Sequence, residues 1–279
     1  IIGPYNPCLF GYFSVALAFM SLSGYHYFYK KDKKLIILPL YGFICGLLAA
    51  LFSGTRGSVI TIPFLTIVFM FQLRRHLSNF NVKLVVAFIA VVFVFLLILF
   101  PHTPLSKRFS KGIEEAEYFI KNHDCVECIG KYDAHHLRMW MEALIIIKDH
   151  PITGVGTKGY RRIVTDRVNN HEIAPGIEIF KTPHNMYLTM LTSYGIFGLI
   201  VLLAFFLVPL SAIIYAIKNS RQNSDLTEIS YCGVFLILGY IIFSITGAFF
   251  IRNMIITFYI VSLSAILSVN RPMDPRPTK

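Results

Sequence analysis

The sequence predicts an all-α polytopic membrane protein with about seven transmembrane helices and one long polar loop. Only 15% of its 279 residues are charged and the mean hydropathy is +0.62, whereas a soluble globular domain carries about 25% charged residues. Apolar runs close to the roughly 20 residues that a bilayer-crossing helix needs recur along the chain. The net charge of +11 comes from short basic clusters between these runs, which is typical of membrane topology rather than of nucleic-acid binding.

Seven apolar runs make up most of the chain. They lie at about Leu9–Tyr29, Leu35–Ser53, Val59–Leu73, Leu84–Phe100, Met186–Ile217, Ile229–Phe249 and Met254–Val269. We therefore predict helices one to four in residues 1–100, a loop in 101–183, helices five to seven in 184–269 and a cytoplasmic tail in 270–279. The fifth run is long enough to extend past the bilayer or to bend near Pro209. Because the chain begins at Ile1 rather than Met, we expect a fragment whose N-terminal part is missing.

The distribution of basic residues predicts the orientation. The short loops on one side, together with the tail, hold 12 Lys and Arg against 4 Asp and Glu, while the two short turns on the other side hold only Arg56 and Arg252. The excess of basic residues places the first set in the cytoplasm. The long loop is nearly neutral, and this topology puts it outside, in the periplasm of a Gram-negative cell. The protein is thus expected in the bacterial inner membrane.

The loop contains one predicted amphipathic helix, His135–Lys148. Its predicted apolar face, at helical spacing, consists of Leu137, Met141, Leu144 and Ile145. Its predicted polar side consists of His135, Arg138 and Glu142. Asp149–Pro151 ends the helix, and the glycine-rich segment Gly154–Gly159 turns the chain. That segment matches GxGxxG, but it follows a helix rather than a strand, so we reject a dinucleotide site.

Three arginines are candidates for binding an anion. Arg56 and Arg252 each stand alone at the outer end of an apolar run, where a charge is costly and often functional. The alternative for both is that they reach to lipid headgroups. For Arg138 the alternative is an i,i+4 pair with Glu142, worth only about 0.2–0.5 kcal/mol. A guanidinium binds phosphate through two parallel hydrogen bonds and stays charged at any working pH.

His184 is the candidate for acid–base chemistry. It follows Pro183 and comes directly before the fifth apolar run. An imidazole titrates near neutral pH and can accept a proton from a sugar hydroxyl. Asn185 could orient it or bind sugar. The alternative is that His184 is an amphipathic anchor at the membrane interface.

Cys125 and Cys128 form a CxxC in the loop, which could be a redox motif, half of a zinc site or a local disulfide. Outside the cytoplasm we expect a local disulfide or two free thiols. The chain lacks HExxH, a P-loop lysine motif and any Asp-x-Asp pair. We therefore predict no metal and no cofactor, so that arginines alone would neutralise a departing diphosphate.

Three segments together resemble the O-antigen ligase family, within the wider group of O-antigen ligases and polymerases. The first is Ser-Gly-Thr-Arg56-Gly between two apolar runs, and the second is Leu137-Arg138-Met-Trp140-Met-Glu142-Ala143 followed by Pro151 and the glycine turn. The third is His184-Asn185, then nine residues, then Gly195-Ile-Phe-Gly198. The resemblance covers essentially the whole chain, which would correspond to the C-terminal portion of a family member.

The resemblance implies a GT-C-like, metal-independent membrane glycosyltransferase. Its donor would be a glycan on undecaprenyl diphosphate and its acceptor the lipid A-core oligosaccharide of lipopolysaccharide. His184 would activate the acceptor hydroxyl, and attack opposite the leaving group would invert the anomeric centre. Arg56, Arg138 and Arg252 would bind the diphosphate, with Asn185 and Glu142 as supporting residues. O-antigen polymerases share much of this pattern, and an anion or lipid transporter is a more distant alternative.

Overall fold

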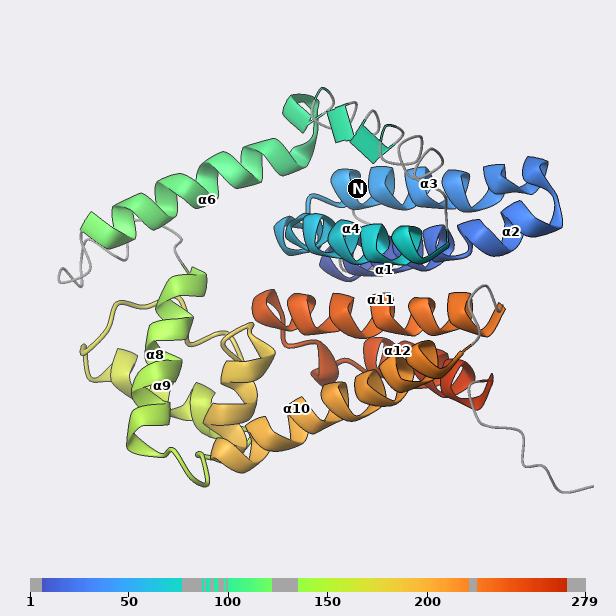
Figure 1. Cartoon of the computed structure of the whole chain (residues 1–279). Coiled ribbons are helices and arrows are strands. Elements are labelled where there is room, and N and C mark those ends of the chain that lie inside the picture. The colour runs from blue at the N-terminus through green and yellow to red at the C-terminus, as the bar shows by residue number, and fades with distance from the viewer. Residues whose placement is uncertain are drawn as a thin grey trace, which may run out of the picture. The chain divides into compact units, whose positions relative to one another are not determined.

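The computed structural model describes residues 7–76, 87, 89–90, 93–94, 98, 100–121, 135–220 and 225–269 (Figure 1). All the secondary-structure elements in these ranges are helices, as predicted. The longer ones are α1 (Pro7–Ser23), α2 (Tyr25–Lys31), α3 (Ile37–Ser53), α4 (Arg56–His76), α6 (Pro104–Lys121), α8 (His135–Asp149), α9 (Gly159–Asn169), α10 (Met186–Asn219), α11 (Asp225–Thr246) and α12 (Asn253–Val269). Three short 3-10 helices are η1 (Lys33–Ile36), η2 (Phe100–His102) and η3 (Phe249–Ile251).

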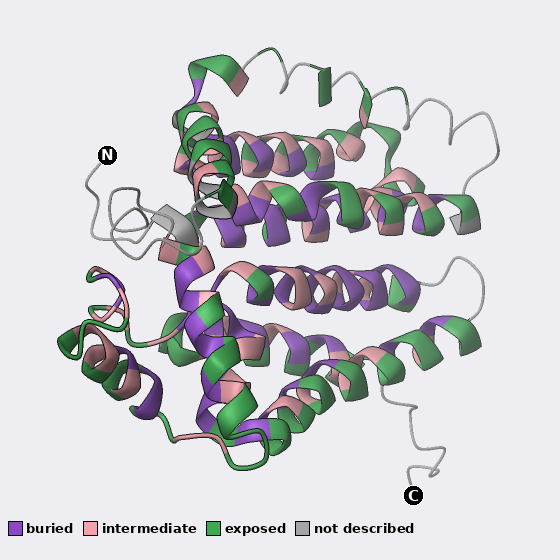
Figure 2. Ribbon diagram, turned by 90° about the vertical axis from the view of Figure 1, so that its left-hand side faces the viewer, coloured by how far each residue is buried: buried purple, intermediate pink, exposed green. Residues whose placement is uncertain are grey.

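Among the described residues, four helices are long and apolar enough to cross a membrane. They are Lys33–Ser53, Arg56–Arg74, Met186–Asn219 and Asp225–Thr246, and α12 is a shorter apolar helix. Many of their exposed side chains are large and apolar, for example Phe197, Val201 and Val208 along α10. Figure 2 shows exposed positions recurring along the helices. Helices that face lipid expose such residues, because hydrocarbon tails are as apolar as the side chains. The chain is a multi-pass membrane protein.

Of the other three predicted runs, one is divided between two helices, one forms a short helix and one lies mostly outside the described residues. The run Leu9–Tyr29 is divided at Gly24 between α1 and α2. The run Met254–Val269 forms the 17-residue α12. The run Leu84–Phe100 lies mostly outside the described residues, as do Cys125, Cys128 and the tail.

The chain forms two compact units, of which the first comprises residues 1–99, 207–240 and 254–279. In this unit α1 packs closely against α3, where Gly46 leaves no room for a side chain: a Cβ there would lie 2.7 Å from the Cβ of Ala18. Small residues allow such close approach between membrane helices. Gln72 of α4 donates to the carbonyl of Ser23 at 2.8 Å and to the carboxylate of Glu228 at 2.7 Å, which joins α1, α4 and α11.

The second unit comprises residues 100–206 and 241–253. Its core lies between α8, α9 and the following segment, and α8 and α9 are adjacent in Figure 1. The buried side chains of this core are Met139, Ala143, Ile146, Tyr160, Val164 and Ile177. Trp140 and Leu188 pack against it while remaining partly exposed.

The structure confirms the predicted loop helix as α8, but the predicted apolar face was wrong. Met141, Leu144 and Ile145 are exposed, whereas Arg138 and Glu142 are buried together with Met139, Ala143 and Ile146. Hydrophobic periodicity gave the wrong face because the two charged side chains find hydrogen-bonding partners outside α8. A buried charge is tolerated when it is paired and hydrogen-bonded.

Candidate functional site

His184 lies at the entrance to α10 with an unusual backbone. Its φ is 52°, in the left-handed region that a residue with a side chain adopts at a cost of roughly 1–2 kcal/mol. Hydrogen bonds fix the residues on both sides of His184. The carbonyl oxygen of Pro183 accepts a hydrogen bond of 3.0 Å from the indole Nε1 of Trp140. Asn185 caps α10, because its side-chain oxygen accepts from the backbone N–H of Leu188 at 3.1 Å.

Two aromatic rings border the His184 imidazole. The Phe180 ring meets it edge to face with centroids 5.2 Å apart, and the His136 ring lies 5.7 Å away. His136 and Trp140 are four residues apart on α8, so one face of this helix meets the segment that carries His184. Neither residue was singled out from the sequence as a neighbour of His184. The i,i+4 spacing alone does not show which face of α8 is turned toward that segment.

The environment of His184 favours the neutral imidazole. Burial lowers the pKa of His184 from its ordinary value, and the positive charge of Arg252 lowers it further. A neutral imidazole keeps a lone pair with which it can accept a proton. Arg252 itself is exposed and lies between η3 and α12. Arg252 belongs to the same unit as His184, although the two residues are far apart in sequence.

Contacts between aromatic residues and α10 position the segment that carries Arg252. The hydroxyl of Tyr187, in the first turn of α10, donates to the carbonyl of Ile241 at 2.8 Å. Further along α10, Phe205 and Phe206 lie against Phe250, with ring centroids 5.2 and 5.5 Å apart. The end of α11 and the turn before α12 are thus held to the helix that begins just after His184.

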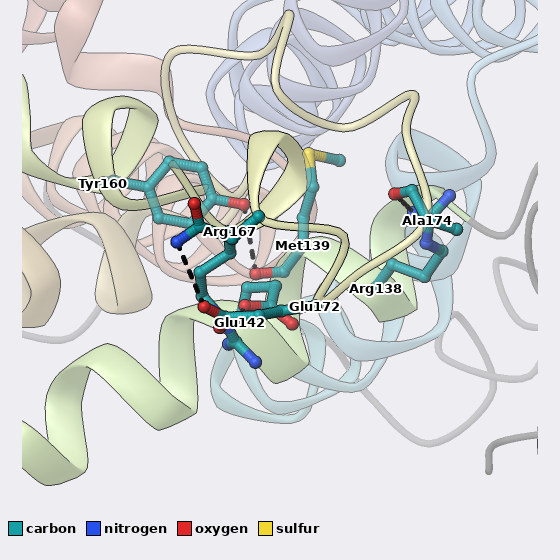
Figure 3. A network of polar contacts seen from close by, with 8 residues as sticks. Arg138, Met139, Glu142, Tyr160, Arg167, Glu172 and Ala174 are labelled. Atoms are coloured by element: carbon teal, nitrogen blue, oxygen red, sulfur yellow. Dashed lines mark hydrogen bonds and ion pairs between the residues drawn. The ribbon is translucent and has the colours of Figure 1, made fainter. Parts of the chain in front are cut away.

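Arg138 is buried on α8, where its guanidinium donates to the carbonyls of Ala174 and Pro175 (Figure 3). Burial lowers the pKa of Arg138, and the nearby carboxylates of Glu178 and Glu142 raise it. Arginine stays protonated through such a shift because its guanidinium is a very strong base. Part of its hydrogen-bonding capacity is used to hold the segment before His184.

Glu142 pairs with Arg167 of α9 rather than with Arg138 (Figure 3). Arg167 also binds Glu172 at 3.0 Å, and this contact lowers the pKa of Glu172. Burial raises the pKa of Glu142, while the two arginines lower it. The i,i+4 pair considered from the sequence is therefore replaced by a tertiary ion pair that joins α8 to α9.

Gly176 lies close to the first turn of α8. A Cβ added there would lie 3.5 Å from the His135 ring and 3.8 Å from the Arg138 guanidinium. The His135 ring in turn lies 5.6 Å from the Phe180 ring, which contacts His184. The first turn of α8 thus packs against the segment before α10.

The glycine turn after α8 docks into a break in α10. Gly195 has φ 62° and ψ −152°, so α10 is not helical at this residue. The backbone groups released there bind the loop: Val155 N–H donates to Thr192 O at 2.8 Å, and Ile196 N–H donates to Pro151 O at 2.9 Å. This break was not expected from the sequence: a bend near Pro209, inside the same helix, was one of two possibilities considered for the long run. The glycine spacing seen in the sequence thus serves a backbone contact between the loop and α10.

Arg56 belongs to the first unit, where it begins α4 and is half-buried. The preceding turn is built by Gly54, which ends α3 at φ 68°, and by the Ser53 hydroxyl, which donates to the Thr55 hydroxyl at 3.0 Å. Ser58 donates to the carbonyl of Thr55 at 2.8 Å and closes the turn. A cation in the first turn of a helix is not stabilised by the helix dipole, so Arg56 is placed there at a cost.

These features define a multi-pass helical membrane protein. Its polar part carries His184, whose environment favours the neutral imidazole, and the exposed Arg252. The family model described as O-Antigen ligase matches residues 41–203, more than half of the chain, so the chain belongs to the O-antigen ligase family. Over 248 residues it is 28% identical to an uncharacterized protein of Haemophilus influenzae. That match covers 87% of this chain and 59% of the relative, so the chain spans less than two thirds of that protein.

Proposed function

We propose that this chain carries the active site of an O-antigen ligase, which moves a glycan from undecaprenyl diphosphate onto the lipid A-core oligosaccharide. The observation that carries the proposal is the position of His184 before α10, bordered by the rings of Phe180 and His136 and on the same unit as Arg252. The excess of basic residues in the short loops supports an inner-membrane location with this site facing the periplasm.

The reaction needs one base and one site for a leaving anion. His184 accepts the proton of an acceptor sugar hydroxyl as its oxygen attacks the anomeric carbon. The bond between that carbon and the diphosphate oxygen breaks, and undecaprenyl diphosphate departs with the bonding electrons. Attack from the opposite side inverts the anomeric centre. Arginines neutralise the charge that develops on the departing diphosphate, so the proposal requires no metal ion.

Among the arginines, we assign this role chiefly to Arg252, which is exposed and whose positive charge lowers the pKa of His184. Arg138 is largely engaged with Ala174 and Pro175, so its contribution comes chiefly through holding the segment before His184. For Arg56, which belongs to the first unit, we propose a role in binding phosphate. Its position in the first turn of α4 adds the partial positive charge of the helix N-terminus.

Replacing Arg56 with lysine is expected to lower transfer by about tenfold to 100-fold. Lysine keeps the charge but loses the planar fork that binds phosphate through two hydrogen bonds. The measurement is the initial rate of glycan transfer by the full-length protein in membranes. Arg74→Lys is the matched control, since Arg74 is an exposed arginine at the other end of the same helix. Equal rates for both variants would exclude a phosphate-binding role for Arg56.

Deleting the gene distinguishes the candidate functions through the lipopolysaccharide profile. A ligase mutant is expected to lose the attached glycan while polymer accumulates on the lipid carrier. Single repeat units on the core would instead indicate an O-antigen polymerase. An unchanged profile would contradict both enzymes and favour a transporter. Restoration by the wild-type gene, but not by a His184→Ala copy, links the phenotype to the proposed site.

A further inference from the structure

The peptide bond between Pro183 and His184 is held by a side chain from another helix. Trp140 of α8 donates its indole N–H to the carbonyl oxygen of Pro183 at 3.0 Å. An indole nitrogen is a donor only, so the direction of this bond is unambiguous. Pro183 is buried and Trp140 packs against the core of α8 and α9. The bond therefore connects the backbone at His184 to a side chain that packs against the core of α8 and α9.

This connection matters because His184 has a left-handed backbone. A residue with a side chain keeps such a conformation only where its surroundings determine it. On the C-terminal side, Asn185 is fixed as the cap of α10. On the N-terminal side, the Trp140 bond fixes the plane of the preceding peptide. With the backbone fixed on both sides, the imidazole of His184 can move chiefly through its side-chain torsions. The rings of Phe180 and His136 restrict these torsions.

We propose that Trp140 is a positioning residue for His184: its hydrogen bond to Pro183 holds the imidazole at the place where it accepts the proton of the acceptor hydroxyl. The inference rests on the proposed role of His184 as general base. It assigns no contact with substrate to Trp140. A general base displaced by about 1 Å loses on the order of 100-fold in rate, so the loss of this bond affects turnover more than substrate binding.

Trp140→Phe tests the inference, because it removes the donor and keeps an apolar ring. In the detergent-solubilised full-length protein, with a lipid-linked oligosaccharide donor and lipid A-core acceptor, kcat should fall about tenfold to 100-fold with little change in donor KM. The acid limb of the rate profile should also move to higher pH. A released imidazole becomes more exposed, and the burial that lowers the pKa of His184 is then reduced.

Tyr160→Phe is the matched control. The Tyr160 hydroxyl donates to the carbonyl of Met139 at 3.3 Å, so this variant also loses a bond from an aromatic side chain to the backbone of the same unit. That bond does not reach the His184 segment, and kcat and the pH profile should stay at their wild-type values. If Trp140→Phe does not insert, benzothienylalanine at position 140 gives the same test, since it keeps the two-ring shape with sulfur in place of N–H.

The outcomes separate the inference from the proposed function. If His184→Ala is inactive but Trp140→Phe has wild-type kcat and pH profile, the positioning role is excluded and the general base stands. A lowered kcat with an unshifted acid limb would also overturn the positioning role, because only packing would then have changed. If His184→Ala transfers glycan at the wild-type rate, the proposed function itself fails.

Discussion

Replacing His184 with alanine in the full-length protein is expected to abolish glycan transfer while the protein still inserts into the membrane. Removal of a general base costs typically 100-fold to 10,000-fold, so transfer should fall at least 100-fold. The measurement is attachment of labelled glycan to lipid A-core by membranes that contain equal amounts of each variant.

His184→Asn is the sharper companion variant. Asparagine tolerates the left-handed backbone at this position better than most residues but cannot accept the proton. Equal inactivity of the alanine and asparagine variants, with normal protease resistance, would assign the loss to chemistry rather than to the backbone. Normal transfer by the asparagine variant would exclude the general-base role.

The same role predicts a pH dependence. Because burial and the charge of Arg252 lower the pKa of His184, the imidazole stays neutral at pH values near its ordinary pKa of about 6.5. Transfer that needs the neutral base should therefore persist at that pH and decline only as the pH falls through the lowered value. A profile whose acid limb lies above the ordinary value would contradict the environment described for His184.

The sequence predicted where the helices lie along the chain better than it predicted their orientation and tertiary contacts. Long apolar runs predicted α3, α4, α10 and α11, because a span of this length and composition has few alternatives to a helix. The bounds of α8 were also predicted closely. Its orientation was not, because Arg138 and Glu142 are satisfied by Ala174 and Arg167, which are 36 and 25 residues further along the chain. Pairings over such distances leave no periodic trace in the sequence.

The candidate site was also predicted only in part from the sequence. The spacing from His184 to Gly195 was visible in the sequence as a resemblance. The structural role of this spacing was not visible, because it depends on where the loop packs against α10. Trp140 belongs to one of the segments that carry the resemblance, but its hydrogen bond to the carbonyl of Pro183 could not be predicted, because that bond depends on tertiary structure.

Gly195→Ala is expected to have the largest effect on stability. With φ 62° and ψ −152°, Gly195 occupies a region that is essentially restricted to glycine. A Cβ there would also overlap the carbonyl of Ile152, which is backbone and cannot move aside cheaply. Strain of about 1–3 kcal/mol adds to an overpacking cost of similar size. We expect a loss of at least about 3 kcal/mol in the stability of the second unit, measured by thermal unfolding in detergent.

Two other loop glycines separate the causes of this loss. Gly156 has φ 80° with nothing within 4 Å of its Cβ position, so Gly156→Ala should cost only the backbone strain. Gly154 has φ 65°, and its Cβ would lie 2.6 Å from the backbone nitrogen of Tyr194. Gly154→Ala should therefore resemble Gly195→Ala, because both substitutions push the loop away from the break in α10. If Gly195→Ala unfolds at the same temperature as Gly156→Ala, the docked loop does not stabilise this part of the protein. If Gly195→Ala unfolds at a much lower temperature than Gly156→Ala, the packing of the loop against the break stabilises α10, whose first turn follows His184.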